Sequence, residues 1–182
     1  MIEFIEDRCT NYQHRTLINA DSADVTLAFA IDFTTPGEIY TEKACKTCER
    51  PIFQLKVNEN GRLNKEEEEK IKELYRYIQT YNCTSINIAG NGIYTFNKYG
   101  ISQSRIDDLV TNVLEHLLER GCKIKEIRSG GQSGADEAGM VAALKLNLKG
   151  ICLFPKGWRF RDVNNKDIKD EKGFKERFLW QV

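Results

Sequence analysis

A ten-residue stretch from Ile127 to Asp136 holds the glycines and polar side chains that nucleotide-binding turns use; it reads IRSGGQSGAD. An apolar alternating run precedes it, and a helical pattern follows it to about Asn147. A strand, a glycine-rich turn and a helix in this order direct backbone N–H groups and the helix dipole toward an anion, usually a phosphate. Glycines let the backbone approach such a ligand closely. The stretch predicts a nucleotide-type ligand, bound by Ser129, Gly130, Gly131, Gln132, Ser133 and Gly134.

The polar residues of this stretch have two interpretations each. Gln132 and Ser133 either face the ligand or cap the helix that follows. Asp136, one turn into that helix, either contacts a ribose or acts as a general base, or it makes a structural hydrogen bond. The turn as a whole either holds a phosphate or is a tight connection that binds nothing. We predict phosphate binding and take Asp136 as one of two candidate catalytic residues.

The elements that must position these residues alternate between strand and helix. Segments apolar on both faces suit a parallel sheet covered by helices, and helical spacing of apolar residues lies between them. The chain therefore predicts a single α/β domain over residues 1–182, with a Rossmann-like, doubly wound, mostly parallel sheet of about five strands and helices on both faces. The expected strands are Val25–Ile31, Ile52–Val57, Ser85–Ala89, Ile124–Arg128 and Ile151–Phe154.

In open α/β sheets, ligands bind beyond the carboxyl ends of the strands, so the residues that follow each strand matter most. Four of the five expected strands end in glycine-containing turns. Together they predict an extended cleft along one edge of the sheet. Its further candidate ligand-binding residues are Arg15, Thr34, Thr35, Gly37, Gly90, Asn91, Tyr94, Lys156 and Arg159.

Three cationic side chains are candidates for binding the phosphates. The planar guanidinium of Arg15 suits a phosphate, and the alternative is a salt bridge to Asp21 or Asp24. Asp24, just before an apolar strand, is expected to be structural. Lys156 and Arg159 would supply further positive charge.

Other candidates would contact the base or carry out chemistry. Asn91 would hydrogen-bond a base and Tyr94 would stack on it, whereas Trp158 would either stack or pack. Glu38 follows a threonine and a proline that begin a helix. It is the second candidate catalytic residue, a carboxylate for hydrolysis.

Two familiar nucleotide motifs are absent. No GxxxxGK[ST] occurs, which excludes a P-loop NTPase. Ser129 stands at the first glycine of the dinucleotide fingerprint, and Pro155-Lys156 stands where an acidic residue would hold a ribose hydroxyl. A standard NAD-dependent dehydrogenase is therefore disfavoured.

Bulk properties narrow the class of protein. Lysine plus arginine equals aspartate plus glutamate at 27 each, which counts against non-specific nucleic-acid binding. No apolar run is long enough for a membrane span, and no signal peptide is present. We expect a cytoplasmic protein that does not bind membranes.

The six cysteines are expected to be mostly reduced. Cys45 and Cys48 form the only CxxC, with no second pair to complete a zinc site, and His14 and His116 lie far apart in the sequence. We therefore expect no metal, and no cofactor other than the nucleotide-type ligand. The charged segment from residue 159 to 182 is expected to be a docked helix, a lid or a subunit contact, because it carries Phe160, Phe174, Phe178, Leu179 and Trp180.

The Ser129–Asp136 stretch resembles the SGGQTGAD motif of the SLOG superfamily, in its YpsA and molybdenum-cofactor-carrier branch. Pro155-Lys156-Gly157 is similar to that branch's C-P-K-G turn. Thr35–Glu38 stands where the branch begins a helix with G-G-T, and differs from it. Three further segments resemble the branch's Y-x-x-R-T-x-x-N, D-S-D-A-T-L and L-N-V-A-G motifs: Tyr12–Asn19, Asp21–Leu27 and Ile86–Gly90.

The order of these motifs differs from that of the branch. There SGGQTGAD comes first, whereas here it follows the others. A circular permutation accounts for this, with the chain opened before Tyr12 and the former termini joined through the helix that ends near Gly121. Permutation requires termini that lie close together, as is common in compact domains. The resemblance also implies a homo-oligomer.

The superfamily implies two functions of different classes. The first is binding of a nucleotide-derived ligand, such as an ADP-ribose-like, NAD-derived or cyclic nucleotide signal, by a protein that senses, carries or sequesters it. The second is hydrolysis of an N-glycosidic bond in a nucleoside monophosphate or NAD-like substrate, for which a related branch uses P-G-G-x-G-T-x-x-E. Here Pro36-Gly37-Glu38 keeps only part of that motif. A third alternative, a molybdenum-cofactor carrier, is implied by the branch's name alone.

Overall fold

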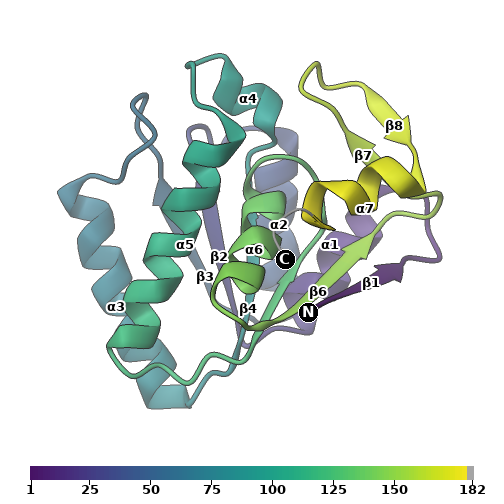
Figure 1. The fold of residues 1–182 in the computed structure, drawn as a ribbon. Helices are drawn as coiled ribbons and strands as arrows, with labels where there is room; N and C mark the ends of the chain where they lie inside the picture. The colour runs from purple at the N-terminus through teal and green to yellow at the C-terminus, as the bar shows by residue number, and fades with distance from the viewer. Residues whose placement is uncertain (180–182) are drawn as a thin grey trace.

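The computed structural model describes residues 1–179 and shows strands and helices that alternate along the chain (Figure 1). Most strands are followed by a helix that returns the chain to the start of the next strand. The elements are β1 (Ile2–Glu6), α1 (Tyr12–Asp21), β2 (Val25–Ala30), α2 (Pro36–Thr47), β3 (Ile52–Lys56), α3 (Lys65–Tyr81), β4 (Ser85–Gly90), α4 (Ile93–Asn97), α5 (Gln103–Glu119), β5 (Glu126–Ser129), α6 (Ala135–Lys145), β6 (Lys149–Phe154), β7 (Arg159–Arg161), β8 (Asp167–Lys169) and α7 (Glu171–Leu179).

Six strands form one sheet in the order β1-β6-β5-β4-β2-β3, and every neighbouring pair is parallel. From β2 the chain moves outward to β3 and then returns to the other side of β2 to form β4. Strands β5 and β6 continue in that opposite direction. The expected doubly wound α/β class is confirmed. Such a reversal opens a crevice at the carboxyl ends of the two strands beside it, here β2 and β4.

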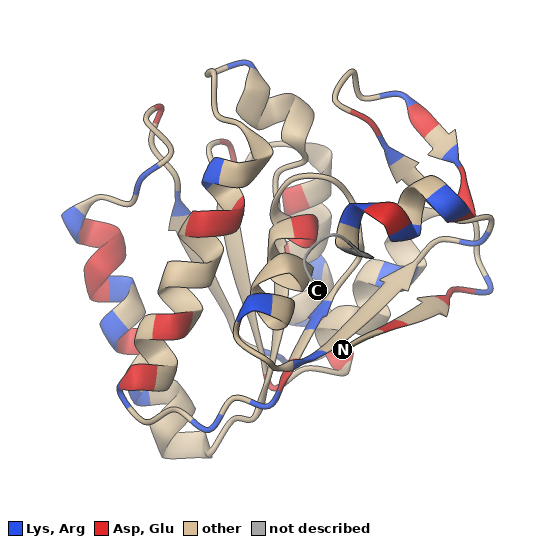
Figure 2. Ribbon diagram, viewed as in Figure 1, with Lys and Arg blue, Asp and Glu red and all other residues tan. Residues whose placement is uncertain are grey.

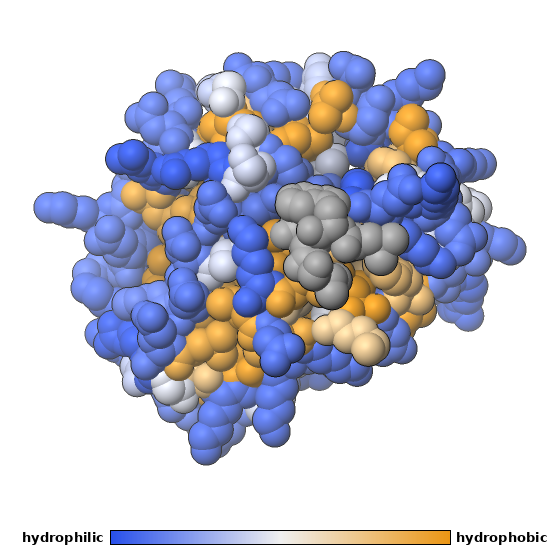
Figure 3. Space-filling view, viewed as in Figure 1, coloured by the Kyte–Doolittle hydropathy of each residue, from blue (hydrophilic) through white to orange (hydrophobic). Residues whose placement is uncertain are grey.

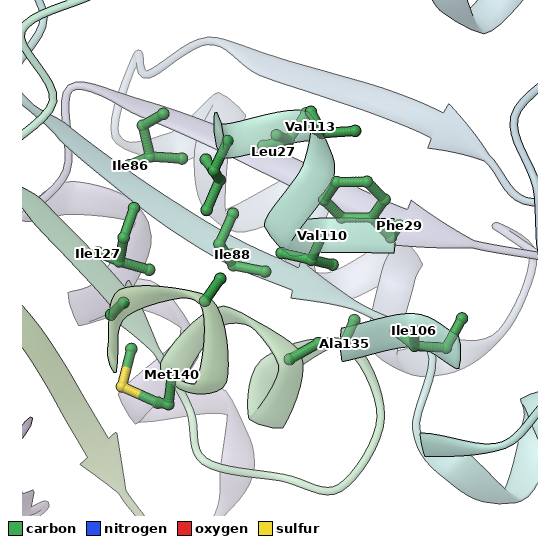
Figure 4. Close-up of a cluster of buried hydrophobic side chains, with 14 of the residues drawn as sticks. Leu27, Phe29, Ile86, Ile88, Ile106, Val110, Val113, Ile127, Ala135 and Met140 are labelled. Carbon is green, nitrogen blue, oxygen red and sulfur yellow. The ribbon is translucent and has the colours of Figure 1, made fainter. Parts of the chain in front are cut away.

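The main hydrophobic core lies between the sheet and helices α3, α5 and α6. Strand β2 is buried along its whole length, and alternate side chains point to opposite faces of the sheet. Leu27 and Phe29 of β2 and Ile88 of β4 face this core, where Val110 of α5 and Met140 of α6 meet them (Figure 4). The apolar layer on this face packs against β2 and β4 up to their carboxyl ends.

The opposite face carries α1 and α2, and its apolar layer is thin. Its buried cluster consists of Ala20, Ala44 and Cys45. The residues of β2 and β4 that face it are small or polar, whereas Ile52 of β3 packs against the cluster. Asn87 of β4 donates a hydrogen bond to Thr26 of β2 at 3.1 Å. Small side chains leave room between the sheet and the two helices, and this is where the candidate site lies.

The expected five strands of the sheet are present, with ends that differ by one or two residues, and β1 adds a sixth to the expected number of about five. This strand pairs with β6 at the edge of the sheet. Its sequence alternates apolar residues with acidic ones, and its burial is partial. A half-exposed edge strand lacks the continuous apolar run that marks the other strands, and β1 was therefore not among the expected strands.

The C-terminal region adds a β-hairpin and a docked helix. Strands β7 and β8 pair antiparallel. This hairpin was not predicted from the sequence. Helix α7 packs with Phe174 and Phe178 fully buried against Phe4 and Phe154 of the sheet. Of the three expectations for this segment, a docked helix describes residues 171–179. Trp180, part of the same expectation, lies outside the described residues.

Charged residues lie mostly on the outer surfaces. Helix α3 begins at Lys65 with Glu66, Glu67 and Glu68 in its first turn, where they complement the helix dipole (Figure 2). Glu67 is buried and pairs with Lys70, so this acidic turn is only partly exposed to solvent. The viewed face of the molecule is largely hydrophilic (Figure 3). Within residues 1–179, no helix combines the length and the apolar character needed to cross a membrane.

Candidate functional site

A cleft of about 820 Å³ lies at the carboxyl ends of β2 and β4, between α1 and α2. This volume is within the range of small-molecule and cofactor sites. Helix starts, glycine turns and the β7–β8 hairpin contribute to its walls. The lining residues are Asn11, Tyr12, Gln13, Arg15, Thr16, Asn19, Thr35, Pro36, Gly37, Glu38, Tyr40, Thr41, Asn87, Ala89, Gly90, Asn91, Gly92, Tyr94, Thr95, Gln132, Asp136, Arg159, Arg161 and Asn165.

Asn91 fixes the point where the strand order reverses. Its Oδ1 accepts from the backbone N–H groups of Ile31 and Asp32, and its Nδ2 donates to the carbonyl of Asp32. Gly90 has a φ of +141°, and a Cβ there would collide with the Phe29 carbonyl. Asn91 therefore binds the ends of β2 and β4 together, and its amide is occupied within the protein rather than free for a base.

The Ser129–Asp136 turn lies beside the cleft, and only Gln132 and Asp136 of it line the cavity. Several of its backbone N–H groups have acceptors within the protein. Gly131 donates to Ser129 Oγ, Gly134 to Gln103 Oε1 and Gln132 to Asp136 Oδ2. The N–H of Ala135, at the start of α6, donates to the carbonyl of Asn91. The turn therefore joins β5, α6 and the end of β4.

The glycines of this turn are needed for close packing. Gly131 and Gly134 have φ values of +68° and +96°, which glycine adopts without strain. A Cβ on Gly130 would collide with the Arg15 guanidinium. A Cβ on Gly131 would come within 2.5 Å of Cys152 and Phe174. Protein atoms thus occupy the space that a side chain at position 130 or 131 would need.

Gln132 and Ser133 hold the β7–β8 hairpin. Gln132 donates to the carbonyl of Arg159 and accepts from the N–H of Arg161, at 3.2 and 2.9 Å. Ser133 Oγ donates to the carbonyl of Arg161 at 2.7 Å. Neither of the two expected roles, facing the ligand or capping the helix, describes these bonds. These hydrogen bonds hold β7, and with it Arg159 and Arg161, beside the cleft.

Arg15 pairs with Asp136, with 3.0 Å between Nη1 and Oδ2, and both side chains are largely buried. The expected alternative, a salt bridge from Arg15 to Asp21 or Asp24, is therefore wrong. Burial raises the pKa of Asp136, and the nearby Arg15 charge counteracts this. Asp24 instead accepts from the N–H groups of Thr84 and Ser85, which confirms its structural role. The Arg15–Asp136 pair brings a buried charged group from α1 and one from α6 to the cleft wall.

Glu38 projects into the cleft from the first turn of α2. Its side chain is nearly buried, and Thr35 Oγ1 donates a hydrogen bond to its Oε2. Desolvation raises the pKa of Glu38 to about 7, and the negative charges of Asp136 and Asp32 add to the effect. A carboxyl group with a pKa near neutrality can exchange protons at physiological pH, as a general acid or base must.

The start of α2 forms one rim of the cleft. Thr35 is the N-cap, and its side chain accepts no capping hydrogen bond from the backbone of the helix. Pro36 lacks an N–H, and the first N–H groups of any helix have no partner within it. A Cβ on Gly37 would meet no atom within 4 Å. The rim therefore presents a helix N-terminus, bare backbone and open space, and Thr34 stays outside it because it bonds to Asp32.

The opposite rim is a cationic group built around Tyr12. The guanidinium groups of Arg159 and Arg161 lie 5.0 and 4.9 Å from the centre of the Tyr12 ring. Asp167 accepts from the Tyr12 hydroxyl and pairs with both arginines. Burial and the Asp167 charge raise the pKa of Tyr12 to about 12. Two arginines against one aspartate leave this rim with net positive charge.

The remaining expected residues divide between the cleft and other sites. Tyr94 lines the cleft and is 38% exposed, which leaves its ring available for stacking. Lys156 is exposed outside the cleft, and its backbone N–H donates to Cys9. Trp158 packs on Phe154, with ring centres 4.3 Å apart, so packing is the correct one of its two interpretations.

One group among the described residues has the side chains of a metal site: Asp7, Cys9 and His14, whose ligand atoms lie within 4.8 Å of one another. The sequence analysis did not predict this group, because its three residues are neither paired cysteines nor paired histidines at the spacing of a metal site. His14 Nδ1 already contacts both oxygens of Asp7, at 2.7 and 2.8 Å. Its Nε2 lies 3.3 Å from the Arg8 guanidinium, a charge that disfavours a cation.

Sequence reasoning also missed residues on the inner wall of the cleft. Asn19, Thr41 and Asn87 are buried polar residues that line it, and Arg161 lies at its rim. Asn19 ends the segment that resembles Y-x-x-R-T-x-x-N, which was the one available signal. Asn87 sat inside an expected strand, where a polar residue in an apolar run could have drawn attention.

A cleft at the reversal point of a parallel sheet, with helix starts at its rim, defines a Rossmann-like α/β protein. A model of the circularly permutated YpsA SLOG family matches residues 2–114, and the chain belongs to this family. The match includes the segments Tyr12–Asn19, Thr35–Glu38 and Ile86–Gly90, and it ends before the Ser129–Asp136 turn. No curated protein and no solved structure matches the chain.

Proposed function

We propose that the chain binds a nucleotide or nucleotide-derived ligand in this cleft, as a protein that senses, carries or sequesters an ADP-ribose-like, NAD-derived or cyclic nucleotide signal. The observation that carries the proposal is the cleft itself, about 820 Å³ at the switch point of the sheet. Membership of the SLOG superfamily supports a nucleotide-related ligand.

The phosphates bind at the rim rather than on the Ser129–Asp136 turn. The start of α2 offers unpartnered helix N–H groups and open space at Gly37. Arg159 and Arg161 offer guanidinium groups that Tyr12 and Asp167 hold in place. Arg15 also lines the cleft, and in this proposal its guanidinium contacts a phosphate as well.

A thermal-shift screen tests the proposal, because a ligand that binds the native state raises the melting temperature by mass action. AMP, ADP-ribose, NAD and cyclic nucleotides form the panel. At a concentration of about 100 times Kd, the expected stabilisation is roughly 3 kcal/mol. If no phosphate-bearing compound of the panel shifts the transition, the proposal is wrong.

Gly37→Asp provides the matched variant. It places one negative charge at the second residue of α2, where it suits the helix dipole but repels a phosphate. We expect a normal fold and an affinity for the nucleotide that is at least tenfold weaker than that of the wild type.

Ser104→Asp is the control, since it adds the same charge at the second residue of α5, outside the cleft. Equal affinities for the two variants would place the phosphates elsewhere.

Glu38 favours a second candidate function, hydrolysis of an N-glycosidic bond. In this reaction its carboxylate accepts a proton from the attacking water, the bond between ribose C1′ and the base breaks, and the base leaves after taking up a proton. A buried carboxyl group with a pKa of about 7 suits this role. Asp136 is the other candidate carboxylate, although its pairing with Arg15 ties it to the cleft wall.

Chromatography of the same incubations distinguishes the two functions. A binding protein returns AMP or NAD intact, whereas a hydrolase releases the free base. Hydrolysis is established if Glu38→Gln abolishes release of the base while Glu42→Gln, on the exposed side of the same helix, retains it.

We further propose that the protein is a cytoplasmic homo-oligomer. Light scattering should then give a mass of at least twice 21.0 kDa.

A further inference from the structure

The strongest unexplained group in the molecule is the side-chain amide of Asn19. The residue is 1% exposed, and neither Oδ1 nor Nδ2 has a hydrogen-bond partner among the described residues. Buried polar groups in native proteins nearly always have partners, because an unmade hydrogen bond is costly. Asn19 lines the cleft. Its missing partner is therefore to be sought inside the cleft.

Asn19 lies at the inner end of the cleft. It is the eighth residue of α1, which at 1.5 Å per residue places it about 10 Å below the rim where the helix begins. Asn87 precedes the end of β4 by three residues, which at about 3.3 Å each is a similar depth. Thr41 is five residues into α2, about 7 Å below the rim. Three elements thus contribute buried polar residues to one inner wall.

The inner end and the rim differ in charge. The rim carries Glu38, Arg159 and Arg161 together with a helix start. The inner residues Asn19, Thr41 and Asn87 are neutral. Thr41 donates to the carbonyl of Gly37, and Nδ2 of Asn87 donates to Thr26, whereas neither polar atom of the Asn19 amide has a partner among the described residues. Such a cleft fits a ligand with an anionic end outward and a neutral polar end inward.

We propose that Asn19 recognises the base of the ligand, by pairing its Oδ1 and Nδ2 with a donor and an adjacent acceptor on the edge of a planar heterocycle. A carboxamide presents one acceptor beside one donor, and this is the pattern with which asparagine binds adenine bidentately. The inference rests on the proposed function. It adds the orientation, with the base at the inner end, and the group that selects the base.

Four probes test this with the full chain. AMP and GMP carry a donor next to an acceptor on the base. Purine riboside 5′-monophosphate has ring acceptors but no exocyclic donor, and ribose 5-phosphate has no base. We expect AMP or GMP to bind about tenfold to a hundredfold more tightly than purine riboside 5′-monophosphate. Asn19→Ala should remove this difference and leave the affinity for ribose 5-phosphate within about twofold.

Asn112→Ala is the matched control, because Asn112 is exposed on α5 and away from the cleft. It should retain the wild-type preference. A second variant, Asn19→Asp, guards against misfolding by Asn19→Ala, since it keeps the shape and replaces the donor. It should bind AMP at least tenfold more weakly than the wild type does. Melting curves of each unliganded variant check that it folds.

The failures of the two proposals are distinguishable by calorimetry on the four probes. If neither these probes nor the compounds of the thermal-shift panel bind, the proposed function falls and this inference with it. If compounds of that panel bind but none of the four probes does, this inference alone is wrong. If AMP and GMP bind no more tightly than ribose 5-phosphate, or if Asn19→Ala keeps their preference over purine riboside 5′-monophosphate, this inference alone is wrong. In that case a trapped water, not a base, is the partner of Asn19.

Discussion

At the scale of residues, the cleft concentrates carboxyl groups whose charge is unfavourable where they lie. Glu38 is nearly buried close to Asp136, and both have raised pKa values because burial disfavours their ionised forms. Asp136 has a cation, Arg15, at 3.0 Å. Glu38 has a hydroxyl donor, Thr35, instead of a cation. This difference makes Glu38 the group that responds to pH near neutrality.

The raised pKa of Glu38 predicts the direction of a stability change with pH. Below pH 4.5 the group is protonated in both the folded and the unfolded state, so it costs nothing. Between 4.5 and about 7 only the folded state keeps the proton, and the free energy of unfolding falls as pH rises. Above pH 7 the full cost is present, at most roughly 3 kcal/mol.

Glu38→Gln removes this cost. We expect the melting temperature of the variant relative to wild type to increase from pH 5 to pH 8 and then to level off. Scanning calorimetry at half-unit pH intervals measures the difference. For Glu42→Gln, the exposed control in the same helix, the difference should stay flat. A flat difference for Glu38→Gln as well would show that Glu38 is ionised in the folded protein at pH 5.

At the scale of elements, α7 supports the Ser129–Asp136 turn from the side opposite to the cleft. Arg177 contacts Glu137 Oε2 at 2.7 Å and donates to the carbonyl of Gly131 at 2.6 Å. Its guanidinium also lies 4.4 Å from the centre of the Phe160 ring. One arginine near the end of the chain thus joins α6, the glycine turn and the hairpin.

Arg177→Met tests this connection. The variant leaves Glu137 buried without its cation, for which we expect a loss of roughly 3 to 5 kcal/mol in the free energy of unfolding. Urea denaturation measures the loss. Lys172→Met in the same helix breaks an exposed pair with Glu176 and should cost less than about 0.5 kcal/mol. Similar losses for the two variants would mean that the buried pair contributes no more than a surface pair.

At the scale of the whole molecule, the two faces of the sheet are unequal. The face under α3, α5 and α6 holds the large core, whereas the face under α1 and α2 buries only Ala20, Ala44 and Cys45 as a cluster. Large apolar side chains stabilise the first face. The second face has a polar cleft where the first face has packed apolar side chains. Local stability should therefore differ between the helices of the two faces.

Hydrogen exchange measures this difference. We expect the amides of α1 and α2 to exchange faster than those of α5 and α6, because fewer buried apolar contacts hold the first pair. Saturation with a nucleotide that binds should slow exchange in α1 and α2 and change α5 little. Equal protection of all four helices without ligand would contradict the view that the cleft face is the weaker one.

The sequence by itself determined the class of fold and the edge of the sheet that carries the site. Its apolar runs are buried on both faces, which only a covered parallel sheet allows, and five strands followed from them. Strand β1 was not predicted, because an edge strand is only partly buried and does not need a continuous apolar run. The glycine turns marked the carboxyl edge because a close backbone approach requires glycine at Gly90, Gly130 and Gly134.

Only the tertiary structure decided which of those residues have their polar atoms bonded within the protein. Asn91, Gln132 and Ser133 are polar in the sequence, but their hydrogen-bond partners belong to distant segments and use them up inside the protein. Asn19 gave no strong signal, yet packing leaves it as the buried amide without a partner. Whether a polar atom is available depends on what surrounds it in space, and residues far apart along the chain supply those surroundings.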